Sequence, residues 1–329
     1  LEEGVALLAD FFAQCLELLA TAGKPDSILA VVTMRKMNGT WADGIRAAFE
    51  RVGVPKDHVF LQDYRESFYW YMMNQRKDLW TYQVALFSCE KGKVTAFELS
   101  VDRKTRPALV SIDEKGIVYL DEMAREGRPE KLWLEVKDEK FLELAKKMFG
   151  KRTFSSVYLV GEEFDKSWMG NSLAFLCNRR KVFMGQNLYS KGACYAAIVR
   201  EQKNPWPYVY MGDNEMKVNV SLKVKNRGKW EFLSLINAGD NWYEASGDCE
   251  VLLDGDKEID FWLQLPHSRD ARIEKLELSD LPERKPKTTR LRISAKPVSD
   301  SKVKIKIRDL GFGEIVKSSD LTWEYTMSL

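Results

Sequence analysis

The sequence contains few of the side chains from which most catalytic and metal centres are built. It has only two histidines, His58 and His267, which lie far apart and have no third partner beside them. A zinc site and a Ser-His-Asp triad are therefore not predicted. An odd number of separate cysteines with no C-x-x-C pair suits a reducing compartment, so we expect a cytoplasmic protein. The five cysteines are Cys15, Cys89, Cys177, Cys194 and Cys249.

Long apolar runs and an excess of one charge are also absent. No run reaches the about 20 apolar residues that a membrane-spanning helix requires. Residues 1–22 contain acidic residues and lack a basic start and a small-residue cleavage pattern, so we do not predict a signal peptide. Lys and Arg number 51 against 49 Asp and Glu, a net charge of +2. We therefore expect neither a membrane nor a nucleic acid as partner.

What is present is an ordinary globular composition whose first half alternates helical and strand patterns. Apolar residues are 45% and charged residues 30% of the chain, and 329 residues fit two domains. The alternation is typical of an α/β fold. Helices are predicted over 5–19 (ended by Gly23), 40–52 (capped by Asn38 or Thr40), 66–74, 140–149 and 190–199. Strands are predicted over 27–33 (buried on both faces), 59–61, 157–160 and a hairpin of 83–88 with 93–101.

The second half is a succession of strand patterns. The run Asn204-Pro205-Trp206-Pro207 breaks the last helix and marks a linker. Beyond it, apolar and polar residues alternate over 218–224, 291–293 and 303–307, with turn sequences between them. We therefore predict two domains, an α/β domain over 1–203 and an all-β sandwich over 204–329.

These segments resemble, in order, part of the DnaK-type heat-shock chaperones of the actin and sugar-kinase superfamily. The run from Ser156 to Gly161, followed by Leu188–Ala197, is similar to the last nucleotide-binding segment of that superfamily. The strands over 276–282, 290–295 and 302–308 are similar to the closing strands of the chaperone's substrate-binding domain. The resemblance implies an actin-like ATPase lobe followed by a β-sandwich, with a protein or peptide client as partner.

The resemblance also implies where a nucleotide would lie. Adenosine would bind at Gly161, beside Ser190 and Lys191, and the phosphates at the hairpin turn that contains Gly92. Asp63 stands where the family has the glutamate that positions the attacking water, which makes it a weak catalytic candidate. The family's first phosphate loop would precede Leu1, so ATP and magnesium are expected only together with a preceding lobe.

The same positions depart from the family's pattern. The hairpin reads Ser88-Cys89-Glu90-Lys91-Gly92 where the family has an aspartate and consecutive glycines, and Glu162 replaces a second glycine. Backbone N–H groups reach phosphates only where side chains leave them bare. We therefore predict a non-catalytic, chaperone-like module for protein interaction or scaffolding, without a resident cofactor or metal. The alternative is an ATP-binding, chaperone-type ATPase whose phosphate-binding residues lie in a missing N-terminal lobe.

Two features of the second half have both a functional and a plain interpretation. The run Asp309-Leu310-Gly311 resembles the superfamily's first phosphate loop, but it follows an alternating strand, and we interpret it as a turn. Segment 309–314 also resembles the end of an uncharacterised bacterial family, from which no activity follows. The basic stripe Lys302, Lys304, Lys306 and Arg308 could dock an anionic partner, but we favour a solvated sheet face.

Two aromatic groups likewise have two interpretations. The helix segment 68–73 could bind a protein, but we favour packing in the core. Trp230, Phe232, Trp242 and Tyr243 could line a peptide groove, but we favour the core of the sandwich.

Overall fold

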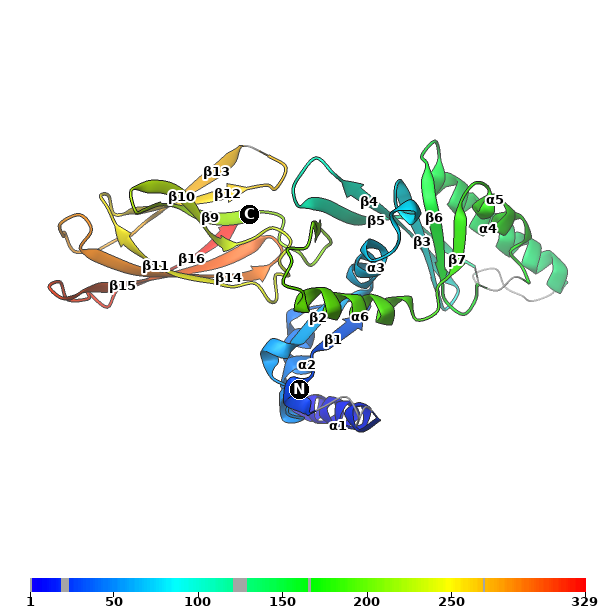
Figure 1. Cartoon of the computed structure of the whole chain (residues 1–329), viewed down its shortest axis with the longest axis horizontal. Helices are drawn as coiled ribbons and strands as arrows, with labels where there is room; N and C mark the ends of the chain where they lie inside the picture. The colour runs from blue at the N-terminus through cyan, green and yellow to red at the C-terminus, as the bar shows by residue number, and fades with distance from the viewer. Residues whose placement is uncertain (1, 19–23, 121–128, 165–166, 269) are drawn as a thin grey trace. The chain divides into compact units, whose positions relative to one another are not determined.

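The chain forms two compact units, residues 1–212 and 213–329, each described here by itself (Figure 1). The computed structural model describes residues 2–18, 24–120, 129–164, 167–268 and 270–329. The boundary follows Gly212 rather than residue 203, because strand β8 (Tyr208–Tyr210) pairs in parallel with strand β5 of the first unit. The predicted helix end at Gly23 lies outside the described residues.

The first unit begins with two helices beside a small parallel sheet. Helix α1 (Glu2–Leu18) packs on α2 (Gly39–Arg51), and the rings of Phe12 and Phe49 stack at 4.0 Å. Asn38 caps α2 by accepting a hydrogen bond from the Trp41 N–H at 2.9 Å. Strand β1 (Ala30–Met34) pairs in parallel with β2 (Val59–Asp63). The expectation that the first strand is buried on both faces was wrong, since all five residues of β1 are half-buried in a two-stranded sheet.

A six-stranded mixed sheet is the centre of the first unit, in the order β7-β6-β3-β4-β5-β8. The predicted hairpin and the predicted buried strand lie side by side at its middle, where β3 pairs with β4 and β6. Strands β5 and β7 were not predicted. The strands not yet given are β3 (Gln83–Glu90), β4 (Lys93–Asp102), β5 (Ala108–Tyr119), β6 (Phe154–Val160) and β7 (Lys181–Met184).

Helices cover both faces of this sheet, which explains why four successive residues of the central strand β3, Val84 to Phe87, are buried. Phe87 of β3 packs under α4 (Glu130–Phe149) and α5 (Gly170–Cys177). Leu86 packs in the cluster that contains residues of α3 (Tyr64–Met73) and α6 (Leu188–Glu201). The aromatic helix segment therefore serves the core, as predicted: Phe68, Tyr69, Met72 and Met73 are buried. Short 3₁₀ helices at Pro25–Ser27, Lys56–His58 and Lys77–Leu79 connect these elements.

The second unit consists of two four-stranded antiparallel sheets, β10-β9-β12-β13 and β11-β14-β15-β16. Residues of both sheets, including Leu222, Phe261, Ile293 and Ile305, form one hydrophobic cluster, so the sheets enclose a common core. The strands are β9 (Asn219–Asn226), β10 (Lys229–Ile236), β11 (Gly247–Leu253), β12 (Glu258–Gln264), β13 (Ala271–Glu277), β14 (Thr289–Ser299), β15 (Lys302–Glu314) and β16 (Thr322–Ser328).

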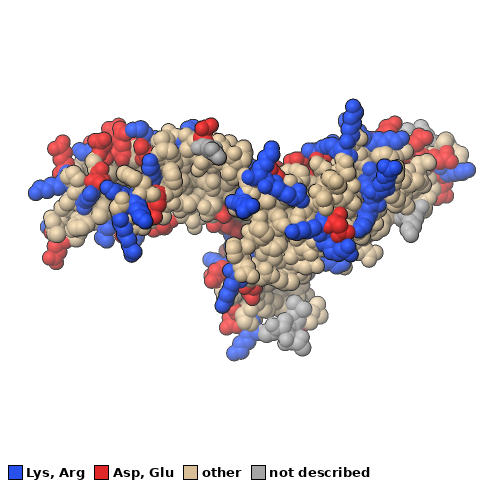
Figure 2. Space-filling view, turned by 45° about the horizontal axis from the view of Figure 1, so that its top comes forward, with Lys and Arg blue, Asp and Glu red and all other residues tan. Residues whose placement is uncertain are grey.

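The basic stripe on β15 lies on the outside of its sheet, as we favoured. Val303, Ile305 and Ile307 are buried in the core, whereas the lysines between them are exposed. Glu324 of β16 accepts from Lys304 at 2.7 Å and lies 3.4 Å from Lys306. Figure 2 shows basic and acidic side chains interspersed on the face that it presents. None of the helices in the described ranges combines the length and apolar character that crossing a bilayer requires.

Candidate functional site

At the β3–β4 hairpin turn, where the resemblance implies phosphate contacts, the backbone groups of Gly92 form hydrogen bonds to other parts of the chain. Lys91 and Gly92 both have positive φ, 48° and 72°, as a two-residue hairpin turn demands. The Gly92 N–H donates to Oε1 of Glu163 at 3.1 Å, and the Gly92 carbonyl accepts from the Leu120 N–H at 2.7 Å. Both backbone groups of the predicted phosphate-contacting glycine therefore have internal partners.

Glu163 is the anion at this turn. Burial raises the pKa of its carboxyl, but hydrogen bonds from the Cys89 thiol and the Gly92 N–H outweigh burial, so the pKa lies below its usual range. The carboxylate is thus ionised at neutral pH. Glu163 was not among the predicted site residues, because a carboxylate two residues after a glycine is not in itself a signal of a binding site.

Gly161 is a glycine because two strands approach closely. It follows β6 with φ of 128°, and an added Cβ would lie 2.2 Å from the Cys89 carbonyl oxygen. No side chain fits that space. The glycine at position 161, where the resemblance places adenosine, is therefore explained by the close contact between the end of β6 and β3.

Asp63, the weak catalytic candidate, caps a helix. It ends β2 and precedes α3, and its Oδ1 accepts from the Glu66 N–H at 2.8 Å. The Arg65 guanidinium lies 3.9 Å from Oδ2, and only 4% of Asp63 is exposed. These contacts place the carboxylate in the interior of the first unit.

Ser190 and Lys191, the other predicted nucleotide contacts, lie in the first turn of α6 and are exposed. The Ser190 hydroxyl and the Lys191 N–H both donate to the Asn187 carbonyl, at 3.1 and 2.9 Å. Asn187 itself is left-handed, with φ of 54°. Of the five predicted residues, these two present side chains to solvent at a helix N-terminus, where backbone N–H groups favour anions.

Tyr189 brings the separate predicted segments together. Its ring stacks on Tyr64 at 4.2 Å with 6° between the planes, and its hydroxyl donates to the Ser88 Oγ at 3.3 Å. Burial raises the pKa of Tyr189, and the Ser88 bond and the charges of Asp63 and Arg35 act on it as well. The ends of β2 and β3 and the start of α6 therefore converge here. Tyr64 and Tyr189 are far apart in the sequence, so no local pattern predicts their stacking.

The acidic residue of the hairpin that the resemblance assigns to phosphate binding is paired with a base. Glu90, at the end of β3, forms an ion pair with Arg35, which follows β1. Within the described ranges, no group of three or more His, Cys, Asp or Glu side chains is arranged to hold a metal ion. The convergence of these segments orders three elements by stacking and ion pairing.

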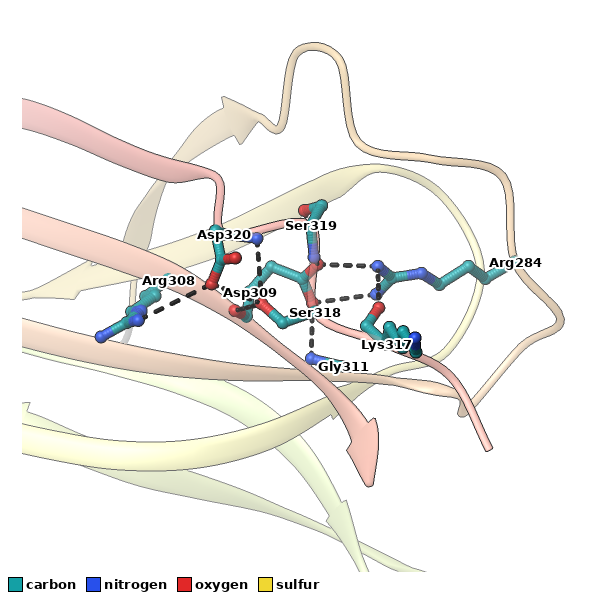
Figure 3. Close-up of polar contacts among 8 residues, drawn as sticks. All are labelled: Arg284, Arg308, Asp309, Gly311, Lys317, Ser318, Ser319 and Asp320. Atoms are coloured by element: carbon teal, nitrogen blue, oxygen red, sulfur yellow. Dashed lines mark hydrogen bonds and ion pairs between the residues drawn. The ribbon is translucent and has the colours of Figure 1, made fainter. Parts of the chain in front are cut away.

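The run Asp309-Leu310-Gly311 lies within strand β15, at a register shift against β14, so its interpretation as a turn was wrong. Asp309 is the centre of a polar cluster (Figure 3). Asp309 is fully buried, and Arg284 donates to both of its oxygens, at 2.9 and 2.8 Å. The Gly311 N–H donates to Oδ1, and the Ser319 N–H and hydroxyl donate to Oδ2. Burial opposes ionisation, yet these bonds hold the pKa of Asp309 well below its usual range. The cluster ties β15 to the segment before β16, and the donors around the Asp309 carboxylate are engaged by that internal anion.

The aromatic residues assigned to the sandwich core do not all lie there. Trp242 packs against the core as favoured, but Trp230 and Phe232 are 65% and 57% exposed, so for these two the expectation was wrong. They alternate along β10 with Leu233 and Leu235 and lie on the outer face of the sheet. Aromatic content alone did not reveal which face of β10 is buried.

Together, these observations define an α/β unit followed by a strand-rich unit. Asp63, Gly92 and Gly161 each have close contacts within the first unit. The chain belongs to the family described as "Family of unknown function (DUF5716) C-terminal", which matches residues 2–213. Residues 215–329 match a second description, "Domain of unknown function (DUF8552)". The two matches meet where the two compact units meet. No curated protein matches the chain.

Proposed function

We propose that this chain is a non-catalytic, chaperone-like module that binds a protein or peptide client and acts in interaction or scaffolding. The observation that carries the proposal is the hydrogen bond from the Gly92 N–H to the Glu163 carboxylate. A fixed internal anion at that turn repels phosphate and uses the backbone donor that phosphate would need.

The fold part of the proposal is that the first unit is a degenerate actin-like ATPase lobe. It is supported by a mixed sheet with α3 and α6 on one face and α4 and α5 on the other. The presence of a glycine at position 161 is explained by its closeness to Cys89, and that of an aspartate at position 63 by its role as a helix cap. Neither explanation requires a nucleotide. A cytoplasmic location fits five cysteines that are all free in the described residues.

The second candidate is a nucleotide-binding ATPase that relies on a preceding lobe. The observation that favours it is the exposed first turn of α6, where Ser190 and Lys191 border a helix N-terminus. In this candidate, Ser190 and Lys191 would border the adenosine that the resemblance places at Gly161, and the phosphate-binding residues would come from the preceding lobe.

A titration of ATP with magnesium into the full-length protein, with any residues that precede Leu1, separates the two candidates. A ligand at 100 times its Kd stabilises a protein by about 2.7 kcal/mol, which a melting curve detects easily. We expect no concentration-dependent rise of the melting temperature up to millimolar ATP. A rise that Lys191→Glu removes and Lys203→Glu retains would contradict the proposal, since Lys203 is an exposed lysine of the same unit outside the α6 N-terminus.

A further inference from the structure

The outer face of the sheet β10-β9-β12-β13 carries aromatic rings with lysines between them. Across the β9–β10 pair, Trp230 lies opposite Lys225 and Phe232 opposite Lys223. Phe232 meets Trp262 of β12 edge to face, with ring centroids 5.3 Å apart. The Lys223 ammonium lies 5.5 Å from the Trp230 ring and 5.4 Å from the Trp262 ring. The lysine is therefore held between two tryptophans by cation–π attraction.

This aromatic–lysine face is not part of the hydrophobic core. Val220 and Leu222 of β9 point into the core on the opposite face of the same sheet. Ile273, which lies opposite Trp262 on β13, adds a further apolar side chain that is 42% exposed. Several large apolar side chains gathered on one exposed sheet face are characteristic of a binding surface rather than of a solvated one.

Two acidic residues of this face pair with Lys275. Lys275 of β13 lies 3.0 Å from Glu258 and 3.9 Å from Asp260, so that half of the face is neutralised. In the part of the chain that the structure describes, neither Lys223 nor Lys225 has an acidic partner. The half that carries Trp230 and Phe232 is therefore both apolar and positively charged.

We propose that the aromatic–lysine face binds an extended acidic peptide in which carboxylates and apolar side chains follow one another on the same side of the peptide, at every second residue. Trp230 and Phe232 are two residues apart on one strand, about 7 Å along it, which is the spacing of same-side residues in an extended peptide. The peptide's carboxylates would pair with Lys223 and Lys225, while its apolar side chains contact the rings. The inference rests on the proposed interaction function and names its surface and the chemistry of its client.

A peptide fits this face better than a nucleic acid does. Nucleic acid affinity comes from many phosphate contacts, and this face offers few unpaired ammonium groups. Glu258 and Asp260 lie on the same face and would repel a uniform polyanion. The Lys223 ammonium also lies close to both tryptophan rings, where stacked bases would have to displace it.

The test measures binding of three fluorescein-labelled probes to the full chain. The probes are an octapeptide that carries Glu and Phe in turn at every second position with Ser between them, its counterpart with Lys in place of Glu, and a dodecamer of thymidine. We expect the acidic peptide to bind at least tenfold more tightly than either other probe. Lys223→Glu combined with Lys225→Glu should weaken that binding at least tenfold, as should Trp230→Ala. Lys302→Glu, an exposed lysine on the other sheet, should leave binding unchanged.

Each other result overturns the inference. Equal binding of the acidic and basic peptides removes the role of the lysines, and tighter binding of the oligonucleotide assigns the face to nucleic acid. Unchanged affinity in the Trp230→Ala variant places the peptide elsewhere. Unaltered melting temperatures show that the variants are folded, as expected for a side chain 65% exposed. The proposed function is judged separately, by the ATP titration of the full-length protein, so either proposal can fail alone.

Discussion

At the scale of single residues, the loop after β6 needs a glycine at position 161 for a reason internal to the sheet. The Cys89 carbonyl on the neighbouring strand lies where a Cβ would stand, 2.2 Å from its ideal position. The φ of 128° adds a conformational cost for any residue with a side chain. The glycine is thus a requirement of how β3 and β6 end together.

Gly161→Ala should lower the free energy of unfolding by about 2–5 kcal/mol, the sum of backbone strain and an overpacked contact. Gly53→Ala is the matched control in the same unit. Gly53 also has positive φ, 89°, but its added Cβ would meet only Pro25 at 3.5 Å. Urea unfolding measures both variants. Equal losses in the two would contradict the role assigned to the Cys89 contact.

The predicted site residues show that sequence patterns locate a residue within its turn or helix but do not identify its partners across the fold. The positions of Gly92, at a hairpin turn, and Ser190, at a helix start, follow from local signals and were found. The internal partner of Gly92 was not, because Glu163 reaches it across the fold. The Tyr64–Tyr189 stack was missed for the same reason. Local periodicity predicts elements, whereas partners from distant elements depend on tertiary packing.

At the scale of elements, the missed segments are those whose pattern is broken by polar residues with specific partners. Helix α4 begins at Glu130, ten residues before the predicted start at Lys140. The first part was not predicted because Lys137 interrupts the apolar pattern. In the structure Lys137 is buried, with its ammonium 5.1 and 4.7 Å from the rings of Trp133 and Trp168. A lysine in an apolar stripe ends the helical pattern when the sequence alone is read. Strand β5 is bulged against β4 and contains the polar run 113–115, which hides its alternation.

The Asp309 cluster makes the connection between β15 and β16 a stabilising element with a defined pH dependence. Asp309→Asn should lower the free energy of unfolding by about 3–5 kcal/mol at pH 7, because it leaves the Arg284 guanidinium, 9% exposed, without its buried counter-charge. The folded-state pKa is lowered, so the stabilisation is fully present above the unfolded-state pKa of about 3.9 and is lost as pH falls below it.

Denaturant unfolding at a series of pH values measures this effect. The difference between the native chain and Asp309→Asn should shrink as pH falls below about 4. Asp320→Asn is the neighbouring control, since Asp320 is 82% exposed and lies 3.8 Å from Arg308. It should change stability by no more than about 1 kcal/mol. A pH-independent difference for Asp309→Asn would refute the assigned ionic role.

At the scale of the whole molecule, two units with separate cores correspond to two separate family matches. The clusters around Phe87 and Leu86 belong to the first unit and the cluster around Phe261 to the second. A change of composition near residue 204 indicated two parts, but β8 extends the first sheet beyond the proline-rich run. Edge strands of three residues carry too weak a pattern to be assigned to one domain from sequence alone.

The last prediction is that Asp213–Leu329 folds alone. It contains every strand of both four-stranded sheets and the cluster around Phe261. At about 0.7 kcal/mol per residue, calorimetry should give a cooperative transition with an enthalpy of about 80 kcal/mol. A fragment that begins at Lys229 is the control. It lacks β9, which lies between β10 and β12, so it should give no cooperative transition. A gradual melt of the longer fragment would mean that the second unit depends on residues before Asp213 for its fold.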